Sequence, residues 1–215
     1  MKALLKLFAL IATLTIFGCG SIEPLPDGWL ELTINEGSNR AKPYRFTWKP
    51  RSYLSYEWRF DQSAAYELGD IDQCDWNKLT GLSLHKFGNH KNSVLVAWRY
   101  DREGFLWIAP YYHENENVFW ADASCTDGFT PTAIDPDLQA IRVDIGDVIE
   151  THINLNIQGD WTALTIINTE TGATSYWENE WEIDFTHTRE IFPWFGGNEK
   201  APHDITIYRR LIADQ

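Results

Sequence analysis

The chain has 215 residues, of which 44% are hydrophobic and 23% charged, and its formal net charge is −13 at pH 7. A chain this acidic is a poor partner for nucleic acid, whose phosphates are bound by clustered Lys and Arg. Eleven Trp, nine Tyr and eleven Phe beside a single Met indicate a core rich in β-strands. This length fits one sandwich domain more naturally than two.

The first twenty residues have the pattern of an exported precursor, in which two lysines precede a short apolar run and then Cys19. The sequence Ile-Phe-Gly-Cys over 16–19 resembles the lipobox of bacterial lipoprotein signal peptides. The resemblance implies cleavage before Cys19 and attachment of acyl chains such as palmitate to it. We therefore expect a signal peptide over 1–18, a lipidated tether over 19–28 and a domain over 29–215. The alternative is an ordinary secretory signal with an incidental cysteine.

The residue after Cys19 is Gly20, whereas Asp at that place would favour retention at the inner membrane. The resemblance thus implies lipid anchoring in the outer membrane of a bacterium, facing the periplasm or the cell surface. If Cys19 carries lipid, Cys74 and Cys125 remain as a pair in a compartment where disulfides persist. We expect them to form a disulfide, and the alternative is two unpaired buried thiols.

Charge is distributed unevenly along the chain. Residues 40–102 hold eleven Lys or Arg against seven acids, whereas residues 103–188 hold only Arg142 against sixteen acids. A folded domain with this pattern has a mildly basic region beside a strongly acidic surface, and a polyanionic glycan could bind only near the basic segment. The alternative for most of the acids is a solvated face that keeps the protein soluble.

Short runs rich in β-branched and aromatic residues, separated by turn signals, follow one another along the chain. Many strands of this length with evenly spaced turns predict an all-β fold, an antiparallel β-sandwich of jelly-roll type. The expected strands are 28–34, 44–49, 53–60, 93–100, 105–113, 118–120, 139–145, 147–157, 161–168, 174–186 and the run ITIY near the C-terminus.

The runs 93–100 and 105–113 are joined by four residues that include Gly104, which predicts a central β-hairpin. Side chains alternate between the two faces of a strand, so the face rich in Val and Trp is expected to pack inside the sandwich. A slip of one residue would exchange the two faces. Without a bulge, the face that would meet a ligand carries Arg99, Trp107, Tyr111 and His113.

Four strings in this chain, DWNKLTGLS, KNSVLVAWRY, IAPYYH and PWFGGNEKAPHDITIY, resemble small bacterial members of the concanavalin A-like lectin and glucanase superfamily. Their order is similar to that in polysaccharide lyases with a jelly-roll fold. In such lyases a tyrosine acts as acid and base, a histidine assists and an arginine neutralises a uronate carboxylate. The resemblance implies these roles for Tyr111, His113 and Arg99, if the protein is an enzyme. It implies ligand contacts for Trp107, His90 and Asn92, whereas the alternative for Tyr111 and His113 is aromatic cover.

A second resemblance concerns the run Glu182-Ile183-Asp184-Phe185, similar to the Glu-x-Asp-x-Glu strand of jelly-roll endoglucanases, with Thr186 at the last place. A retaining glycosidase needs two carboxyl groups, so the run favours a strand with solvated acids. Related glucanases also place a structural Ca²⁺ ligand where this chain has Asp204. The six histidines show no zinc spacing, so we expect no cofactor, with structural Ca²⁺ left open.

These observations favour a lipid-anchored envelope protein whose jelly-roll domain binds carbohydrate on the sheet that contains the hairpin. One alternative is a polysaccharide lyase or glycoside hydrolase acting in the same groove. Another is a structural envelope lipoprotein without a ligand. The expected partners are a glycan and, through the lipid, the membrane, and we expect a monomer.

Overall fold

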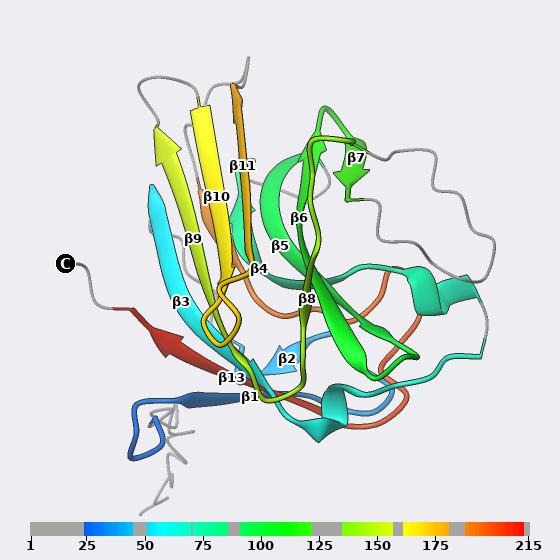
Figure 1. Ribbon diagram of the computed structural model, residues 1–215. Coiled ribbons are helices and arrows are strands. Elements are labelled where there is room, and N and C mark those ends of the chain that lie inside the picture. The colour runs from blue at the N-terminus through cyan, green and yellow to red at the C-terminus, as the bar shows by residue number, and fades with distance from the viewer. Residues whose placement is uncertain are drawn as a thin grey trace, which may run out of the picture.

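The computed structural model describes residues 24–44, 51–69, 71–85, 91–121, 135–156, 161–180 and 188–212. These residues form two antiparallel β-sheets that face one another, an all-β sandwich of jelly-roll type (Figure 1). Two short 3₁₀ helices, η1 (Gln62–Ala64) and η2 (Ile71–Cys74), connect the sheets. The fold class predicted from the sequence is therefore confirmed.

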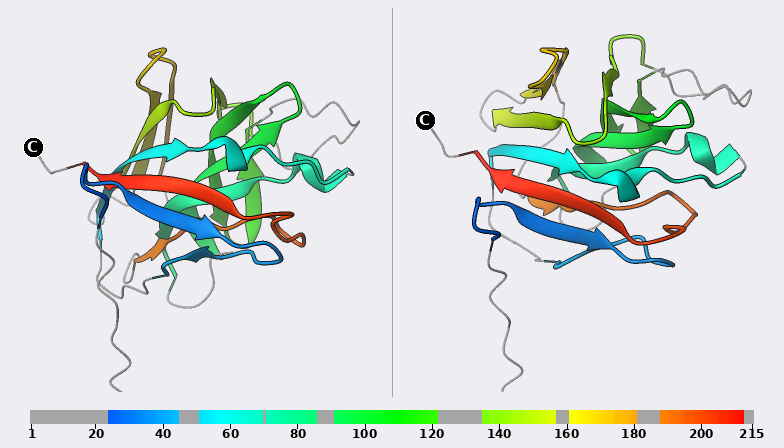
Figure 2. Two further views of the ribbon diagram at one scale, coloured as in Figure 1. Left: turned by 90° about the horizontal axis from the view of Figure 1, so that it is seen from below. Right: turned by 60° about the horizontal axis from the view of Figure 1, so that its bottom comes forward.

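The larger sheet has seven strands, in the spatial order β11-β10-β9-β3-β13-β1-β2. Its convex outer face is visible from two sides in Figure 2. Strand β10 alternates strictly between buried and half-buried residues, as expected where one face packs on a core and the other meets solvent. The strands are β1 (Leu30–Ile34), β2 (Ala41–Lys42), β3 (Tyr53–Phe60), β9 (Val148–Asn156), β10 (Trp161–Asn168), β11 (Thr174–Glu180) and β13 (Ile205–Leu211).

The smaller sheet has six strands, in the order β12-β4-β5-β6-β7, and β8 pairs with the first half of β6. Its central strands are buried on both faces, because one face packs on the larger sheet and the other is covered by aromatic side chains. The strands are β4 (Asn77–Ser83), β5 (Asn92–Asp101), β6 (Phe105–Glu114), β7 (Asn117–Trp120), β8 (Ile141–Val143) and β12 (Arg189–Ile191).

Large aromatic residues fill the space between the sheets. Trp58 and Phe60 on β3 and Trp98 on β5 are at most 1% exposed, and the rings of Phe60 and Trp98 lie 5.0 Å apart. Tyr66 and Phe195 contact Trp98 edge to face. Such contacts add to the apolar area that each ring removes from water, so this aromatic group is a main source of the sandwich's stability.

The predicted hairpin is confirmed as β5 and β6. Gly104 adopts a φ of +96° in the connecting turn, a conformation that favours glycine. The register pairs Arg99 with Trp107, Leu95 with Tyr111 and Ser93 with His113, without a bulge between the two strands. The face rich in Val and Trp therefore packs inside, as the alternation predicted.

Three strands were not predicted: β2, which has only two residues, β4 and β12. Strand β4 is buried on both faces and contains Gly81, so it shows no alternation, and β12 has only three residues. Some expectations fall partly or wholly outside the described residues: the strand over 44–49, the last residue of the strand over 147–157, the end of the strand over 174–186, and the acids of the Glu-x-Asp run.

The expected signal peptide and lipid attachment at Cys19 also lie outside the described residues. Cys74 is buried at the end of η2, but Cys125 lies in 122–134, which the structure does not describe, so their disulfide stays a prediction. Within the described ranges, no helix has the length and apolarity needed to cross a bilayer.

Candidate functional site

A cleft of about 360 Å³ opens on the face of the six-stranded sheet that turns away from the other sheet. Leu95 and Ile191 contribute apolar floor to this cleft, which we call the β12 cleft after the edge strand beside it. Its basic lining residues are Arg40, Lys78, His113 and Arg189, and its aromatic ones are Tyr44, Phe192 and Trp194.

The main chain of residues 193–196 brings distant lining residues together. Trp194 N–H donates to the carbonyl of Lys78 and Lys78 N–H donates to the carbonyl of Trp194, both at 2.8 Å. The neighbouring Pro193 carbonyl accepts from Ala41 N–H at 3.1 Å, and Trp194 also forms a β-bridge with Arg40. This segment therefore joins β2, at the edge of the larger sheet, to β4 in the smaller one.

Two amide side chains, the buried Asn77 and the half-buried Asn39, fix this segment. Asn77 is 1% exposed, and its Oδ1 accepts a hydrogen bond from Gly196 N–H at 2.5 Å while its Nδ2 donates to the Tyr66 hydroxyl at 2.9 Å. Asn39 Nδ2 donates to the Phe195 carbonyl at 2.9 Å. Because buried polar groups that satisfy one another hold a unique geometry, the wall of the cleft is preformed.

The cleft floor depends on the close approach of β4 and β5. A Cβ atom on Gly81 would lie 2.3 Å from the Val94 carbonyl oxygen and 2.5 Å from Leu95 Cδ2. Only glycine fits there, and its missing side chain lets Leu95 lie across β4 at the base of the cleft.

Two ring residues of β6 lie at the same end of the hairpin. His113 is buried, and its Nδ1 is hydrogen-bonded to Ser93 Oγ at 2.8 Å. Tyr111 contacts His113 edge to face at 5.2 Å between ring centroids and stacks on Trp120 at 6.1 Å. Burial, reinforced by the charge of Asp75, raises the pKa of Tyr111, so its hydroxyl is protonated at neutral pH.

Lys78 reaches across this floor. Its Nζ donates to the Trp76 carbonyl at 2.9 Å and lies 5.0 Å from the centroid of the Tyr111 ring. Burial lowers the pKa of Lys78 to about 8, although the nearby charge of Asp75 acts in the opposite direction. The side chain is therefore mostly charged at pH 7 but close to its titration range.

The mouth of the cleft combines a cation with exposed aromatic surface. Tyr44 is 46% exposed and contacts Phe192 edge to face at 5.5 Å. The exposed Arg40 places its guanidinium carbon 5.2 Å from the Trp194 ring and 5.9 Å from the Tyr44 ring. Amphipathic rings beside a fixed donor are the usual means of holding a polar, ring-shaped ligand.

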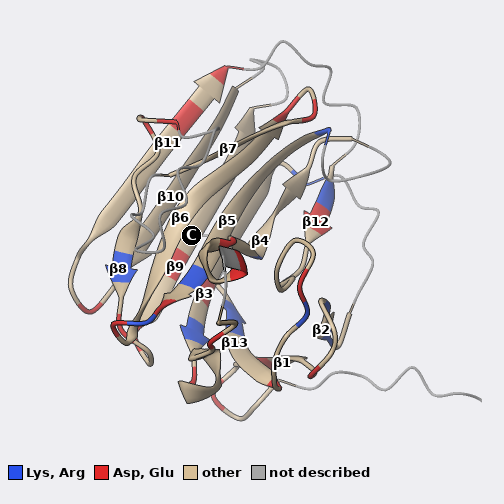
Figure 3. Cartoon of the chain, turned by 90° about the vertical axis from the view of Figure 1, so that its right-hand side faces the viewer, with Lys and Arg blue, Asp and Glu red and all other residues tan. Residues whose placement is uncertain are grey.

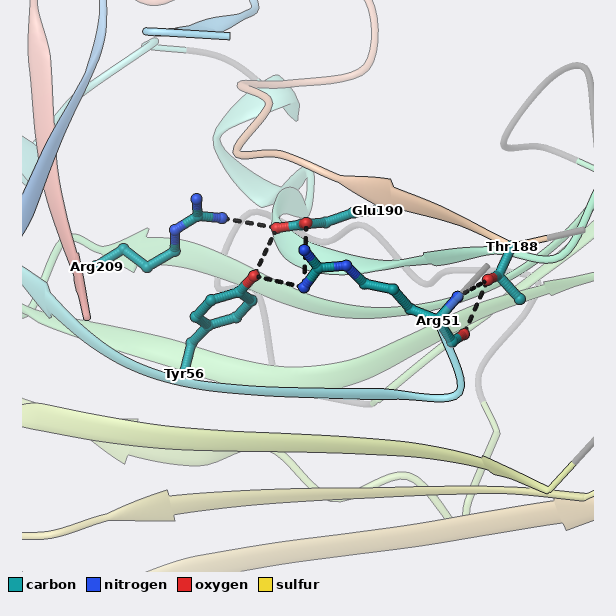
Figure 4. Close-up of polar contacts among 5 residues, drawn as sticks. All are labelled: Arg51, Tyr56, Thr188, Glu190 and Arg209. Atoms are coloured by element: carbon teal, nitrogen blue, oxygen red, sulfur yellow. Dashed lines mark hydrogen bonds and ion pairs between the residues drawn. The ribbon is translucent and has the colours of Figure 1, made fainter. Parts of the chain in front are cut away.

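The acid on β12 is neutralised from the interior of the sandwich (Figure 4). Glu190 accepts hydrogen bonds from Arg209 Nη1 at 2.7 Å and from the Tyr56 hydroxyl at 3.0 Å, and Arg51 Nη1 lies 3.9 Å from its other oxygen. Burial raises the pKa of Tyr56, with the Arg209 charge opposing it. This carboxylate is therefore already paired, and a second acid close to the cleft is Asp75, whose Oδ2 would lie 3.3 Å from a Cβ on the lining residue Gly197.

The structure separates the residues that the sequence grouped as one surface. Tyr111 contacts His113, which lines the β12 cleft, but Arg99 lies four residues along β5 from the partner of Tyr111, roughly 13 Å away at 3.3 Å per residue. Arg99 is buried under the Trp76 ring, 5.1 Å from its guanidinium, and donates to the Cys74 carbonyl at 3.4 Å. Trp107, beside Arg99, donates to Asp101 Oδ2 at 3.1 Å.

Among the described residues, the other predicted ligand and metal contacts, Asn92 and Asp204, do not line the β12 cleft. Asn92 is buried, and its Oδ1 accepts from Asn115 N–H at 2.9 Å, a contact that fixes the turn after β6. His90 lies outside the described residues. Asp204 is exposed and accepts from Glu36 N–H at 2.7 Å. Among the residues that the structure describes, no three His, Cys, Asp or Glu side chains are placed to hold a metal ion.

Sequence reasoning did not single out the residues that build the cleft. Arg40 and Lys78 belong to the segment recognised as basic, and Trp194 to the string PWFGGNEK, so partial signals existed. Arg189 had no signal, because it lies on a three-residue strand whose pairing with β4 cannot be read locally.

No protein-family model and no curated protein sequence matches the chain. Solved structures with a similar fold include a winged bean acidic lectin complexed with methyl-α-D-galactose, with TM-score 0.43 and 11% identity over 89% of this chain and 90% of the lectin. Alginate lyase vAL-1 from Chlorella virus has TM-score 0.42 and 13% identity over 89% and 86%. A scytalido-glutamic peptidase with a transition state analog inhibitor has TM-score 0.35 and 8% identity over 85% and 64%. At TM-scores this low, function must be argued from the residues of this chain.

Proposed function

We propose that the protein binds carbohydrate in the β12 cleft. The observation that carries this proposal is the mouth of the cleft, where the exposed Tyr44 ring lies beside Phe192 and Trp194, next to the guanidinium of Arg40. Aromatic rings stack on the apolar faces of sugars, while Arg and Lys donate hydrogen bonds to their oxygens. The volume of about 360 Å³ lies within the range of small-ligand sites, roughly 300–1,000 Å³.

The test is binding of the detergent-solubilised full chain to a panel of neutral and acidic polysaccharides, read by retardation in glycan-containing native gels. Trp194→Ala and Tyr44→Ala should weaken retardation by removing the rings at the mouth. Tyr176→Ala is the matched control, because this tyrosine is 55% exposed on β11 and does not line the cleft. Retardation that all three variants retain would place the binding elsewhere.

Polysaccharide lyase activity is the second candidate, favoured by the contact of Tyr111 with His113, which lines the cleft. The raised pKa of Tyr111 means that this tyrosine needs a partner to accept its proton before it could act as a base. The separation of Arg99 from this pair means that Arg99 would not share their bound sugar. Appearance of unsaturated products that Tyr111→Phe abolishes would establish this activity.

We also propose that the domain is held at the outer membrane by lipid on Cys19, a proposal supported by the lipobox-like sequence that precedes it. Metabolic labelling with a palmitate analogue in a bacterial host tests it. The wild-type chain should incorporate label and fractionate with outer membranes, whereas Cys19→Ala should not. Equal labelling of both chains would show that Cys19 is not the site of lipid attachment.

A further inference from the structure

We infer that the carbohydrate bound in the β12 cleft carries a negatively charged group, a carboxylate or a sulfate, held by Lys78 together with Arg40 and Arg189. This inference rests on the proposed function and names the ligand class of the same site.

The sign of the charge in the cleft is opposite to that of the chain. The protein carries −13 overall, yet the cleft is lined by Arg40, Lys78 and Arg189. Among the lining residues that the structure describes, Glu190 is the acid, and its oxygens accept from Arg209 and Tyr56 on the interior side. A recess lined by one sign of charge focuses the potential and concentrates ligands of the other sign.

The positions of charged residues in the fold also bear on the anionic ligand. Figure 3 shows acidic residues on β11, whereas β12 carries both a basic and an acidic residue, Arg189 and Glu190. The basic segment 40–102 supplies Arg40 and Lys78, two of the three Lys and Arg residues that line the cleft.

Lys78 is the residue at which an anion would have the largest effect. Its ammonium group has three donors, of which one is directed to the Trp76 carbonyl, and it lies 5.0 Å from the centroid of the Tyr111 ring, within the field of the nearby Asp75 charge. Holding a partly buried cation there is costly, as its lowered pKa of about 8 shows, and a bound anion would offset that cost.

Binding should therefore be linked to proton uptake. An anion beside Lys78 raises its pKa, so above neutral pH each binding event takes up part of a proton. The other titratable or charged groups that act on Lys78 or share its cleft are Asp75, Arg40, Tyr44, Tyr111, His113, Arg189 and Glu190. Near pH 8, Lys78→Met should remove this proton uptake. A substitution of His113 alone should leave the proton uptake in place.

The experiment is titration calorimetry of the full chain in detergent against four polymers of similar length. These are a uronic-acid polymer, a sulfated galactan, the corresponding neutral galactan and polyglutamate, each tested in two buffers of different ionisation enthalpy. We expect the acidic glycans to bind at least about tenfold more tightly than the neutral one, with salt-dependent affinity and buffer-dependent heat. Preference between the uronate and the sulfated polymer identifies the anionic group.

Matched variants test whether the preference for acidic glycans comes from the cations of the β12 cleft. Lys78→Met and Arg40→Gln should each lower affinity for the acidic glycan by about tenfold and lower that for the neutral glycan much less, whereas Lys78→Arg should retain most of the affinity for the acidic glycan. Arg142→Gln is the control, since this arginine lies on β8 with 60% of its side chain exposed. Because Arg40 is exposed, its variant stays informative even if Lys78→Met fails to fold.

The outcomes separate the two proposals. Equal affinity for neutral and acidic galactans, unchanged in Lys78→Met and Arg40→Gln, overturns the anionic ligand and leaves carbohydrate binding in place. Binding of polyglutamate as tight as that of the acidic glycans retains the anion site but contradicts its preference for sugars. Binding of none of the four overturns both.

Discussion

Lys78 and Trp194 exchange a pair of main-chain hydrogen bonds, each of 2.8 Å, between β4 and the segment that follows β12. Through this pair, the residue that carries the buried ammonium group is fixed to the ring that forms the wall of the same cleft. Displacement of either strand would change both the charge and the aromatic surface that a ligand meets.

Gly81→Ala should be among the most destabilising single-atom changes in the protein. The added Cβ would collide with the Val94 carbonyl and Leu95, which belong to the neighbouring strand, and overpacking of this kind costs about 1–3 kcal/mol or more. Urea unfolding followed by tryptophan fluorescence measures the change. Gly172→Ala is the control, because nothing lies within 4 Å of its Cβ and its cost, about 1 kcal/mol, comes from a φ of +74°.

Glu190→Gln should lower the free energy of unfolding by about 3–5 kcal/mol, because it leaves Arg209 without its counter-charge between the sheets. The Glu190 side chain is 2% exposed and that of Arg209 11%, so solvent cannot replace the lost partner. The double variant Glu190→Gln with Arg209→Met should recover part of the loss. If the double variant is as unstable as the sum of the two single ones, the ion pair is not what joins β12 to β13.

The stability of the protein should rise with pH between about 8 and 10. Lys78 has a pKa of about 8 in the folded chain, whereas the ordinary pKa of lysine is 10.5, so in this range the unfolded chain binds more protons and raising the pH favours folding. Above pH 10 the sign reverses, because burial raises the pKa of Tyr66 to about 12 and the folded chain then binds more protons. Urea midpoints measured across this range test the first effect, which Lys78→Met should abolish.

If Cys74 and Cys125 form the predicted disulfide, reduction should destabilise the chain by roughly 4 kcal/mol, since the bridge closes a loop of about fifty residues. Mass spectrometry of the peptides released without reduction identifies the pairing directly. A free thiol on Cys74 in protein purified from an oxidising compartment would contradict it, and Cys74→Ser would then cost little beyond local packing.

The sequence was most informative where structure is set locally. Alternation and the turn at Gly104 predicted the hairpin of β5 and β6 with its register, and regular spacing of turns predicted the sandwich. The cleft could not be predicted in this way, because Arg40, Lys78 and Trp194 meet through pairing between segments far apart in the chain. Position on a common face also did not place Arg99 beside Tyr111, since a shared face does not fix distance along a strand.

Protection of Lys78 from acetylation by a bound glycan, read by mass spectrometry, shows directly whether the β12 cleft is the binding site. Lys200 provides the internal control, because it is exposed and does not line the β12 cleft. We expect a saturating glycan to slow acetylation of Lys78 several-fold and to leave that of Lys200 unchanged. Acetylation of Lys78 at the same rate with and without a glycan that demonstrably binds the protein would contradict the assignment of the cleft as the binding site.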